Sequence, residues 1–136
     1  MKIQDAICNE CFVEIKPSDQ GYDICELSGE INIKHGKFTG WSSTVPLLKL
    51  QDFINQFESF CISRNTEPKL EGVYNTYFQF YTRETINGEE IILMEFSIGD
   101  ARFSPFIFNL TGLLEIDEKK LPLILSDFRE LAQQSY

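Results

Sequence analysis

The sequence predicts an α+β protein, a two-layer sandwich in which an antiparallel sheet of about six to seven strands carries two amphipathic helices on one face. Two observations lead to this prediction. Two segments repeat apolar residues at a helical period, and the remaining segments are short, apolar-rich and bounded by turn-forming residues. Consecutive strands joined by short turns run antiparallel, and two one-sided helices packed on such a sheet make a second layer.

Both helices are predicted from the spacing of their apolar residues. In residues 50–61 and 121–132, apolar side chains fall at offsets 0, 3, 4, 7, 10 and 11, which places them on one side of a helix. Polar residues occupy the opposite side. The second helix is expected to begin between Asp117 and Pro122, because acidic residues favour a helix N-terminus and proline is tolerated only in the first turn.

The strands are predicted from runs of apolar and β-branched residues between turn signals. Ser28-Gly29 and His35-Gly36 are interpreted as turns, and Asn87-Gly88 predicts a hairpin with a type I′ turn, because both residues tolerate positive φ. The expected strands cover residues 11–16, 22–27, 30–34, 37–44 (extending to 48 as an alternative), 74–84, 90–99 and about 102–112.

Length and composition indicate a single domain over residues 1–136, with residues 1–10 as a loosely ordered lead-in. Hydrophobic residues make up 43% of the chain, and twelve phenylalanines predict a core rich in aromatic rings. No segment has the composition of a signal peptide or reaches the roughly 18 apolar residues that a membrane span needs. We therefore expect a cytoplasmic protein.

The net charge of −9 narrows the class of partner. Nucleic acids and anionic membranes require a basic surface, so neither is expected as a ligand. A basic protein partner is compatible with the charge, and its association would be accelerated electrostatically. The alternative is that the acidity serves only solubility.

No metal or cofactor site is predicted. The four cysteines are Cys8, Cys11, Cys25 and Cys61, and only the first two form a C-x-x-C pair. Their spacing does not suggest a zinc site, and the pair lacks the strand-to-helix setting of a redox motif, so we interpret them as buried, reduced thiols. Phosphate-binding glycine loops are absent, since Gly36 and Gly40 lack the following Lys-Ser/Thr and are expected to shape a hairpin with a partly buried Trp41.

Catalysis is not expected from the residue types present. His35 is the only histidine and lies in a predicted turn, which leaves a nucleophile–histidine arrangement without support. Paired carboxylates remain an alternative, with Glu95 and Asp100 or Glu115 and Asp117 as candidates, although no pocket that would shift a pKa is indicated.

The sheet face opposite the helices is predicted to bind a partner. Alternation places one set of side chains of strands 74–84, 90–99 and 102–112 away from the core, and tyrosine and arginine there supply rigid contact area and directional hydrogen bonds. An ordinary solvated face is the alternative, and Ile91, Leu93 and Ile107 raise a further one, an aliphatic patch for self-assembly. The candidate partner-binding residues are Tyr77, Gln79, Tyr81, Arg83, Glu95 and Asn109.

Several segments together resemble a known family. Leu27-Ser28-Gly29-Glu30-Ile31-Asn32-Ile33 is followed by Gly36-Lys37-Phe38-Thr39-Gly40-Trp41, then by Leu50-Gln51-Asp52-Phe53 and Phe57, and finally by the helix over residues 121–131. This pattern resembles the WapI-type immunity proteins of bacterial polymorphic toxin systems, from about residue 11 to 134. The family has no catalytic residue to carry over to this chain, and its binding residues vary.

The resemblance implies a non-enzymatic cytosolic antitoxin that occludes a cognate toxin. Many such toxins are nucleases with basic clefts, which an acidic protein could fill by placing carboxylates where phosphates bind. The sequence alone leaves two alternatives open, a generic interaction or self-assembly module and a small carboxylate-dependent enzyme.

Overall fold

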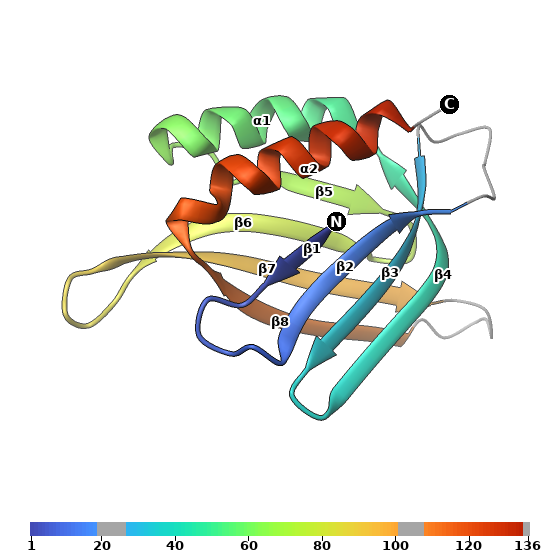
Figure 1. Cartoon of the computed structure of the whole chain (residues 1–136), viewed down its shortest axis with the longest axis horizontal. Helices are drawn as coiled ribbons and strands as arrows, with labels where there is room; N and C mark the ends of the chain where they lie inside the picture. The colour runs from blue at the N-terminus through green and yellow to red at the C-terminus, as the bar shows by residue number, and fades with distance from the viewer. Residues whose placement is uncertain (19–26, 101–107, 135–136) are drawn as a thin grey trace.

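The computed structural model describes residues 1–18, 27–100 and 108–134, and within them the chain forms one antiparallel sheet with two helices (Figure 1). The sheet is a meander of eight strands in the order β1 to β8, so the predicted α+β class is confirmed with more strands than expected. The elements are β1 (Lys2–Gln4), β2 (Cys11–Pro17), β3 (Leu27–His35), β4 (Phe38–Leu48), α1 (Leu50–Ser63), β5 (Lys69–Gly72), β6 (Tyr77–Glu84), β7 (Glu90–Asp100), β8 (Phe108–Ile116), a single 3₁₀ turn (Glu118–Lys120) and α2 (Leu121–Gln133).

Two short strands, β1 and β5, were not expected from the sequence. β1 corrects the prediction of a loosely ordered lead-in, because it pairs with β2 and buries Ile3 to 1% exposure. β5 pairs with both β4 and β6 and thereby joins the two halves of the sheet. At three and four residues, both strands are too short to show an alternating pattern.

The expected break at Ser28-Gly29 is also wrong. Both residues lie inside β3, where the pairing with β4 shifts register between Gly29 and Ile31, so the local disturbance is a bulge rather than a turn. Most of the strand expected over residues 22–27, and the first part of that expected over 102–112, lie outside the described residues.

The hairpin at Asn87-Gly88 is confirmed, but its turn type is not. Only Gly88 has a positive φ there (80°), and its N–H donates to the carbonyl of Thr85 at 2.9 Å. A type I′ turn requires positive φ at both central residues. Two consecutive positive φ angles occur instead between β5 and β6, at Tyr74 (φ 58°) and Asn75 (φ 59°). Neither residue is a glycine, so the sequence contains no signal for this turn.

Both helices begin and end close to where the sequence predicts. Asp117 accepts the backbone N–H of Lys119 at 3.0 Å and so caps the 3₁₀ turn that leads into α2, while Pro122 lies in the first turn of the helix. α1 ends at Ser63 and is capped by Arg64, whose guanidinium donates to the carbonyls of Phe60 and Cys61 at 2.6 Å each. Among the described residues, no helix combines the length and the apolar character that crossing a bilayer requires.

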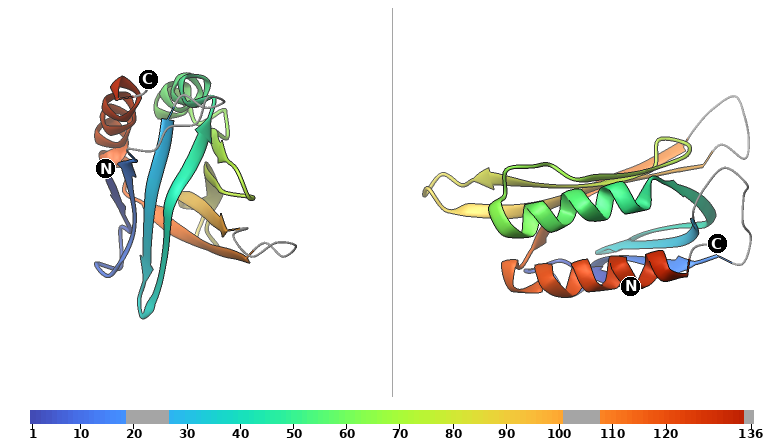
Figure 2. Two further views of the ribbon diagram at one scale, coloured as in Figure 1. Left: turned by 90° about the vertical axis from the view of Figure 1, so that its right-hand side faces the viewer. Right: turned by 90° about the horizontal axis from the view of Figure 1, so that it is seen from above.

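The core lies between the curled sheet and the two helices, which run side by side (Figure 2). Each helix covers strands from the other half of the chain: Phe57 of α1 packs against Phe80 of β6 with ring centroids 4.7 Å apart, and Leu123 and Ile124 of α2 lie beside Ile3 of β1. The predicted aromatic core is thus present. Burying each such ring contributes about 1.5–3 kcal/mol before conformational entropy is counted.

The two ends of the sheet approach each other at the turn after β1. The backbone N–H of Ala6 donates to the carbonyl of Glu115 in β8 at 2.8 Å, and the backbone N–H of Glu115 donates to the carboxylate of Asp5 at 2.9 Å. The first hairpin is therefore fastened to the last strand, and the helices lie on the inner side of the curl. No helix of the described residues lies on the outer side.

Candidate functional site

The predicted partner-binding residues lie on the outer side of strands β6 to β8. Residues alternate along β6, so Phe78 and Phe80 enter the core while Tyr77, Gln79, Tyr81 and Arg83 face outward. The register of β6 with β7 places Gln79 opposite Glu95. Five of the six candidates are thus brought together, whereas Asn109 lies opposite Gly99, further along the sheet on β8.

Tyr77, Tyr81, Arg83 and Glu95 form a connected group that we call the tyrosine–glutamate cluster. The hydroxyl of Tyr77 donates to the carboxylate of Glu95 at 2.6 Å, and the guanidinium of Arg83 lies 4.3 Å from the ring centre of Tyr81. Tyr81 is only 8% exposed, which is low for an outward-facing position. These contacts restrict the side chains of the cluster to defined positions.

The electrostatics of the cluster are dominated by Glu95. The hydrogen bond to this carboxylate, together with partial burial, raises the pKa of Tyr77 above its ordinary value. Burial, followed by the charge of Glu95, raises the pKa of Tyr81. In both cases a phenolate next to a carboxylate is disfavoured, so both hydroxyls stay protonated at neutral pH and remain hydrogen-bond donors.

The cations of this face are paired with acids. Lys69 lies 3.5 Å from Glu71 and 4.6 Å from the ring centre of Tyr77, and Arg83 lies 3.8 Å from Glu67. These ion pairs are exposed and contribute little to stability. These acids nevertheless neutralise the charges of Lys69 and Arg83, so the electrostatic potential at the cluster is dominated by the carboxylate of Glu95.

The aliphatic patch considered from the sequence is only partly present. Ile91 and Leu93 are half-buried on the outer side of β7, and Ile107 lies outside the described residues. Leu113 of β8, opposite Glu95 in the register, is 45% exposed and was not anticipated. It adds an apolar side chain beside the tyrosine–glutamate cluster.

Trp41 defines a second outer surface, which the sequence did not predict. Its side chain is 58% exposed rather than partly buried in a hairpin, and its indole N–H donates to Glu30 at 3.0 Å. This bond and a longer one from Asn32 lower the pKa of Glu30. Because Trp41 is paired with Asn32 across β3 and β4, correct knowledge of the register would have placed it on the polar side of the sheet.

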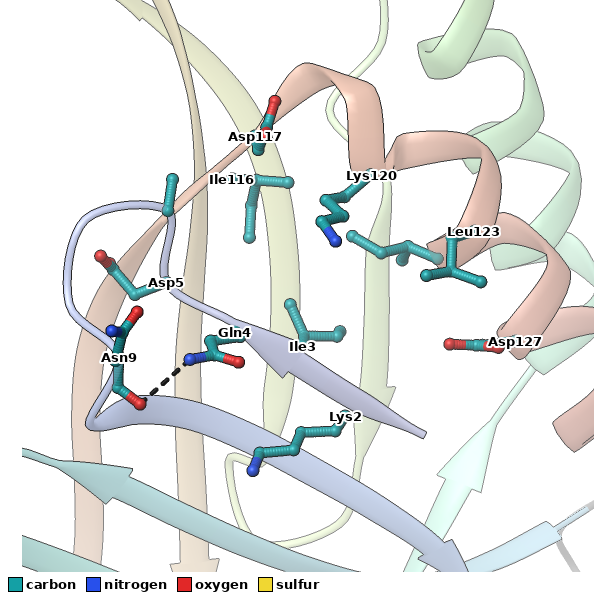
Figure 3. A pocket seen from close by; sticks show the side chains of 12 residues that line it. Lys2, Ile3, Gln4, Asp5, Asn9, Ile116, Asp117, Lys120, Leu123 and Asp127 are labelled. Carbon is teal, nitrogen blue, oxygen red and sulfur yellow. Dashed lines mark hydrogen bonds between the residues drawn. The ribbon is translucent and has the colours of Figure 1, made fainter.

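A cavity of about 310 Å³ lies between β1 and α2 (Figure 3). Lys2 and Lys120 contribute positive charges, whereas Asp5, Asp117 and Asp127 contribute negative ones. The oxygens of Asp5 already accept backbone N–H groups of Ile7, Cys8 and Glu115. The cavity thus contains charges of both signs, and Asp5 is occupied by backbone hydrogen bonds. This lining does not indicate whether a ligand would be a cation or an anion.

The structure does not bring the candidate catalytic residues of the described chain together in one site. His35 ends β3 with its side chain exposed. Asp117 serves as a cap rather than as a partner for Glu115, and the side chain of Asp100 lies outside the described part of the chain. Across residues 1–18, 27–100 and 108–134, no group of three or more histidine, cysteine or acidic side chains is arranged to hold a metal ion.

The sequence predicted that the cysteines are buried, and this is true of only one of the three described. Cys11 is buried, while Cys8 and Cys61 are half-buried, and all three are free. Burial raises the pKa of Cys61, which lies on α1 and packs against the hydrophobic core. Cys25 lies outside the described residues.

No protein-family model, curated protein or solved structure matches this chain. The fold and the surfaces therefore define the protein by class alone: an acidic α+β protein with two helices on the inner side of a curled sheet.

Proposed function

We propose that this chain is a non-enzymatic binding protein that docks a basic protein partner on the outer side of β6 to β8. The observation that carries the proposal is the tyrosine–glutamate cluster, in which a 2.6 Å hydrogen bond joins Tyr77 to Glu95 on a face that no helix of the described residues covers (Figure 2). Interface hot spots are rich in tyrosine and arginine, and side chains that are already ordered lose less entropy on binding.

The charge of the chain supports a basic partner. The net charge of −9 accelerates encounter with a positively charged surface, and Glu95 supplies an acceptor at the centre of the proposed contact. Leu113 and Leu93 provide adjacent apolar area, so the surface combines an apolar contact with hydrogen bonding, as protein interfaces do.

Within this class, the particular role that we propose is that of a cytoplasmic immunity protein that neutralises a bacterial toxin by occlusion. The support is the resemblance of the sequence to WapI-type immunity proteins, together with the acidity. A toxin with a basic catalytic cleft, such as a nuclease, would accept the carboxylates of this chain in place of substrate phosphates.

Calorimetric titration with the product of the neighbouring gene, which the proposed role requires to be a toxin-like protein, tests the proposal. Glu95→Gln removes the charge while keeping a hydrogen-bond acceptor for Tyr77, and it should raise Kd about tenfold or more, or about 1.4 kcal/mol. Glu30→Gln is the matched control, because Glu30 is also a carboxylate bonded to an aromatic side chain on an outer face. It should change Kd by less than about threefold, since it lies outside the proposed contact.

The possible outcomes test the binding surface and the immunity role separately. If Glu30→Gln weakens binding and Glu95→Gln does not, the partner docks at Trp41 and the proposed surface is wrong. If the neighbouring protein neither binds nor is inhibited, the immunity role is lost.

A second candidate function is self-association along β8. The backbone N–H and C=O of Glu115 point away from β7 and already bond to Asp5 and Ala6. A second copy would therefore pair at Thr111 and Leu113, whose backbone groups alternation directs the same way. Within the described residues β8 is the last strand of the sheet, and Leu113 is exposed beside this edge. Light scattering across a concentration series would detect the dimer, and Thr111→Pro should abolish it by removing an edge N–H.

A further inference from the structure

The turn between β1 and β2 holds two sulfur atoms close together. The thiol of Cys11 lies 2.9 Å from the sulfur of Cys8 and donates its hydrogen to it. The backbone N–H of Cys11 also donates to the carbonyl of Cys8 at 3.2 Å, which closes a tight turn. A turn of this kind brings the two Cα atoms within about 7 Å, a separation that a disulfide can bridge.

We propose that Cys8 and Cys11 form a thiol–disulfide exchange site, whose reaction partner is a low-molecular-weight disulfide and whose product is an intrachain disulfide between the two residues. The sulfurs need to approach by less than about 1 Å to reach a bond of about 2.05 Å. The alternative, predicted from the sequence, is that the cysteines are inert because they are buried and reduced. This alternative fits Cys11 but not Cys8, which is only half-buried.

The two thiols have different roles in the reaction. Cys8 is the more exposed, and it receives the hydrogen bond that Cys11 donates. That hydrogen bond, assisted by burial, raises the pKa of Cys11. Cys8 is therefore the attacking thiol, and Cys11, 3% exposed, is the resolving thiol.

The reaction is balanced in two steps. Cys8 loses its proton to solvent, and its thiolate attacks one sulfur of the small disulfide, which releases one small thiolate and leaves a mixed disulfide on Cys8. Cys11 then loses its proton and attacks the sulfur of Cys8, which releases the second small thiolate. The protein loses two protons and two electrons, and the small disulfide is reduced to two thiols.

The surroundings hold the pair in this geometry. The carboxylate of Asp5 accepts the N–H of Cys8 at 2.8 Å, and the backbone N–H of Asp5 donates to the carbonyl of Cys11 at 2.9 Å. The same carboxylate is bonded to Glu115 in β8. Oxidation of the pair therefore fixes the turn that fastens the first hairpin to the last strand.

Oxidised glutathione is the probe that tests the proposal. The Cys25→Ser/Cys61→Ser variant, which keeps only the proposed pair, is incubated with oxidised glutathione, and its intact mass is measured. We expect the mass to fall by two hydrogens, with little glutathione adduct, and dithiothreitol to reverse the change. A protein that stays reduced, or that carries two glutathione adducts, would overturn the proposal.

Single variants in the same background test the two roles. Cys11→Ser should accumulate one glutathione adduct on Cys8, because the resolving thiol is missing. Cys8→Ser should react at least tenfold more slowly, because Cys11 is buried. Equal rates for the two variants would contradict the assignment of Cys8 as the attacking thiol, and circular dichroism of both checks that they fold.

Discussion

The carboxylate of Asp5 accepts the backbone N–H of Glu115 at 2.9 Å, although 110 positions separate the two residues in the chain. Asp5 also accepts the N–H groups of Ile7 and Cys8 at 2.8 Å each. One side chain thus satisfies three backbone donors at the point where the first and last strands of the sheet meet. We therefore expect Asp5 to matter more for stability than any exposed acid of this chain.

Asp5→Ala should lower the free energy of unfolding by about 2–3 kcal/mol, because three backbone N–H groups lose their acceptor, two of them in partly buried positions. Glu130→Ala, which changes an exposed acid of α2, should alter it by less than about 0.5 kcal/mol. Urea unfolding followed by circular dichroism measures both values. Equal effects would show that the connection to Glu115 contributes nothing.

Because of Asp5, we also expect the free energy of unfolding to decrease in acid. Burial acts to raise the pKa of Asp5, but the hydrogen bonds from Cys8, Glu115 and Ile7 outweigh it, so the folded-state pKa lies below the ordinary value of 3.8. A group whose pKa is lowered by folding stabilises the protein above its unfolded pKa. This contribution should decline as pH falls below about 4 toward the folded pKa. Asp5→Asn should remove this part of the pH dependence in unfolding measurements between neutral and acidic pH.

Phe57 should be a sensitive position in the core. Its ring is fully buried and lies 4.7 Å from that of Phe80 and 5.8 Å from that of Phe128, so it connects the two helices to the sheet. Phe57→Ala should cost about 3–5 kcal/mol through lost burial and the cavity that remains. Phe57→Leu should cost less and remains measurable if the alanine variant does not fold. Losses below about 1 kcal/mol for both would contradict the described packing.

Glu95→Gln should lower the pKa of Tyr77. The raised pKa arises first from the hydrogen bond to the Glu95 carboxylate, and a neutral amide no longer disfavours a neighbouring phenolate. Spectrophotometric titration of tyrosinate, compared with the same titration of Tyr77→Phe, isolates this residue. Glu30→Gln, on the other outer surface, should leave the titration unchanged.

Gly99 and Gly36 should respond differently to alanine. A Cβ at Gly99 would overlap the carbonyl oxygen of Tyr74, which is backbone and has little freedom to move. We expect Gly99→Ala to cost about 3 kcal/mol or more. Gly36 has a φ of 63° with open space around it, so Gly36→Ala should cost only about 1 kcal/mol of backbone strain. Similar midpoints in urea unfolding would contradict this difference.

The sequence predicted those parts of the fold that depend on neighbours along the chain. Both helices follow from a local period, and the hairpins at His35-Gly36 and Asn87-Gly88 follow from residues that favour turns. The outward positions of Tyr77, Gln79, Tyr81 and Arg83 follow from simple alternation within one strand. Each of these features is determined within about a dozen residues, so no knowledge of distant contacts is needed.

The sequence did not predict what depends on pairing between distant segments. β1 and β5 are strands because the neighbouring strands offer hydrogen bonds, not because their own residues favour it. Trp41 is exposed because the register of β3 with β4 pairs it with Asn32, and an error of one position would have buried it. The hydrogen bond of Tyr77 to Glu95 likewise requires the register of β6 with β7.

By itself, therefore, the sequence determined the class of fold, the two amphipathic helices, the aromatic core and the negative charge of this protein. Only the tertiary structure decided that the sheet curls until Asp5 meets Glu115, that each helix covers the other half of the chain, and that Cys8 and Cys11 lie within reach of each other. The physical reason is that periodicity and turn preference act between near neighbours, whereas strand register and sheet closure are set by the packing of the whole chain.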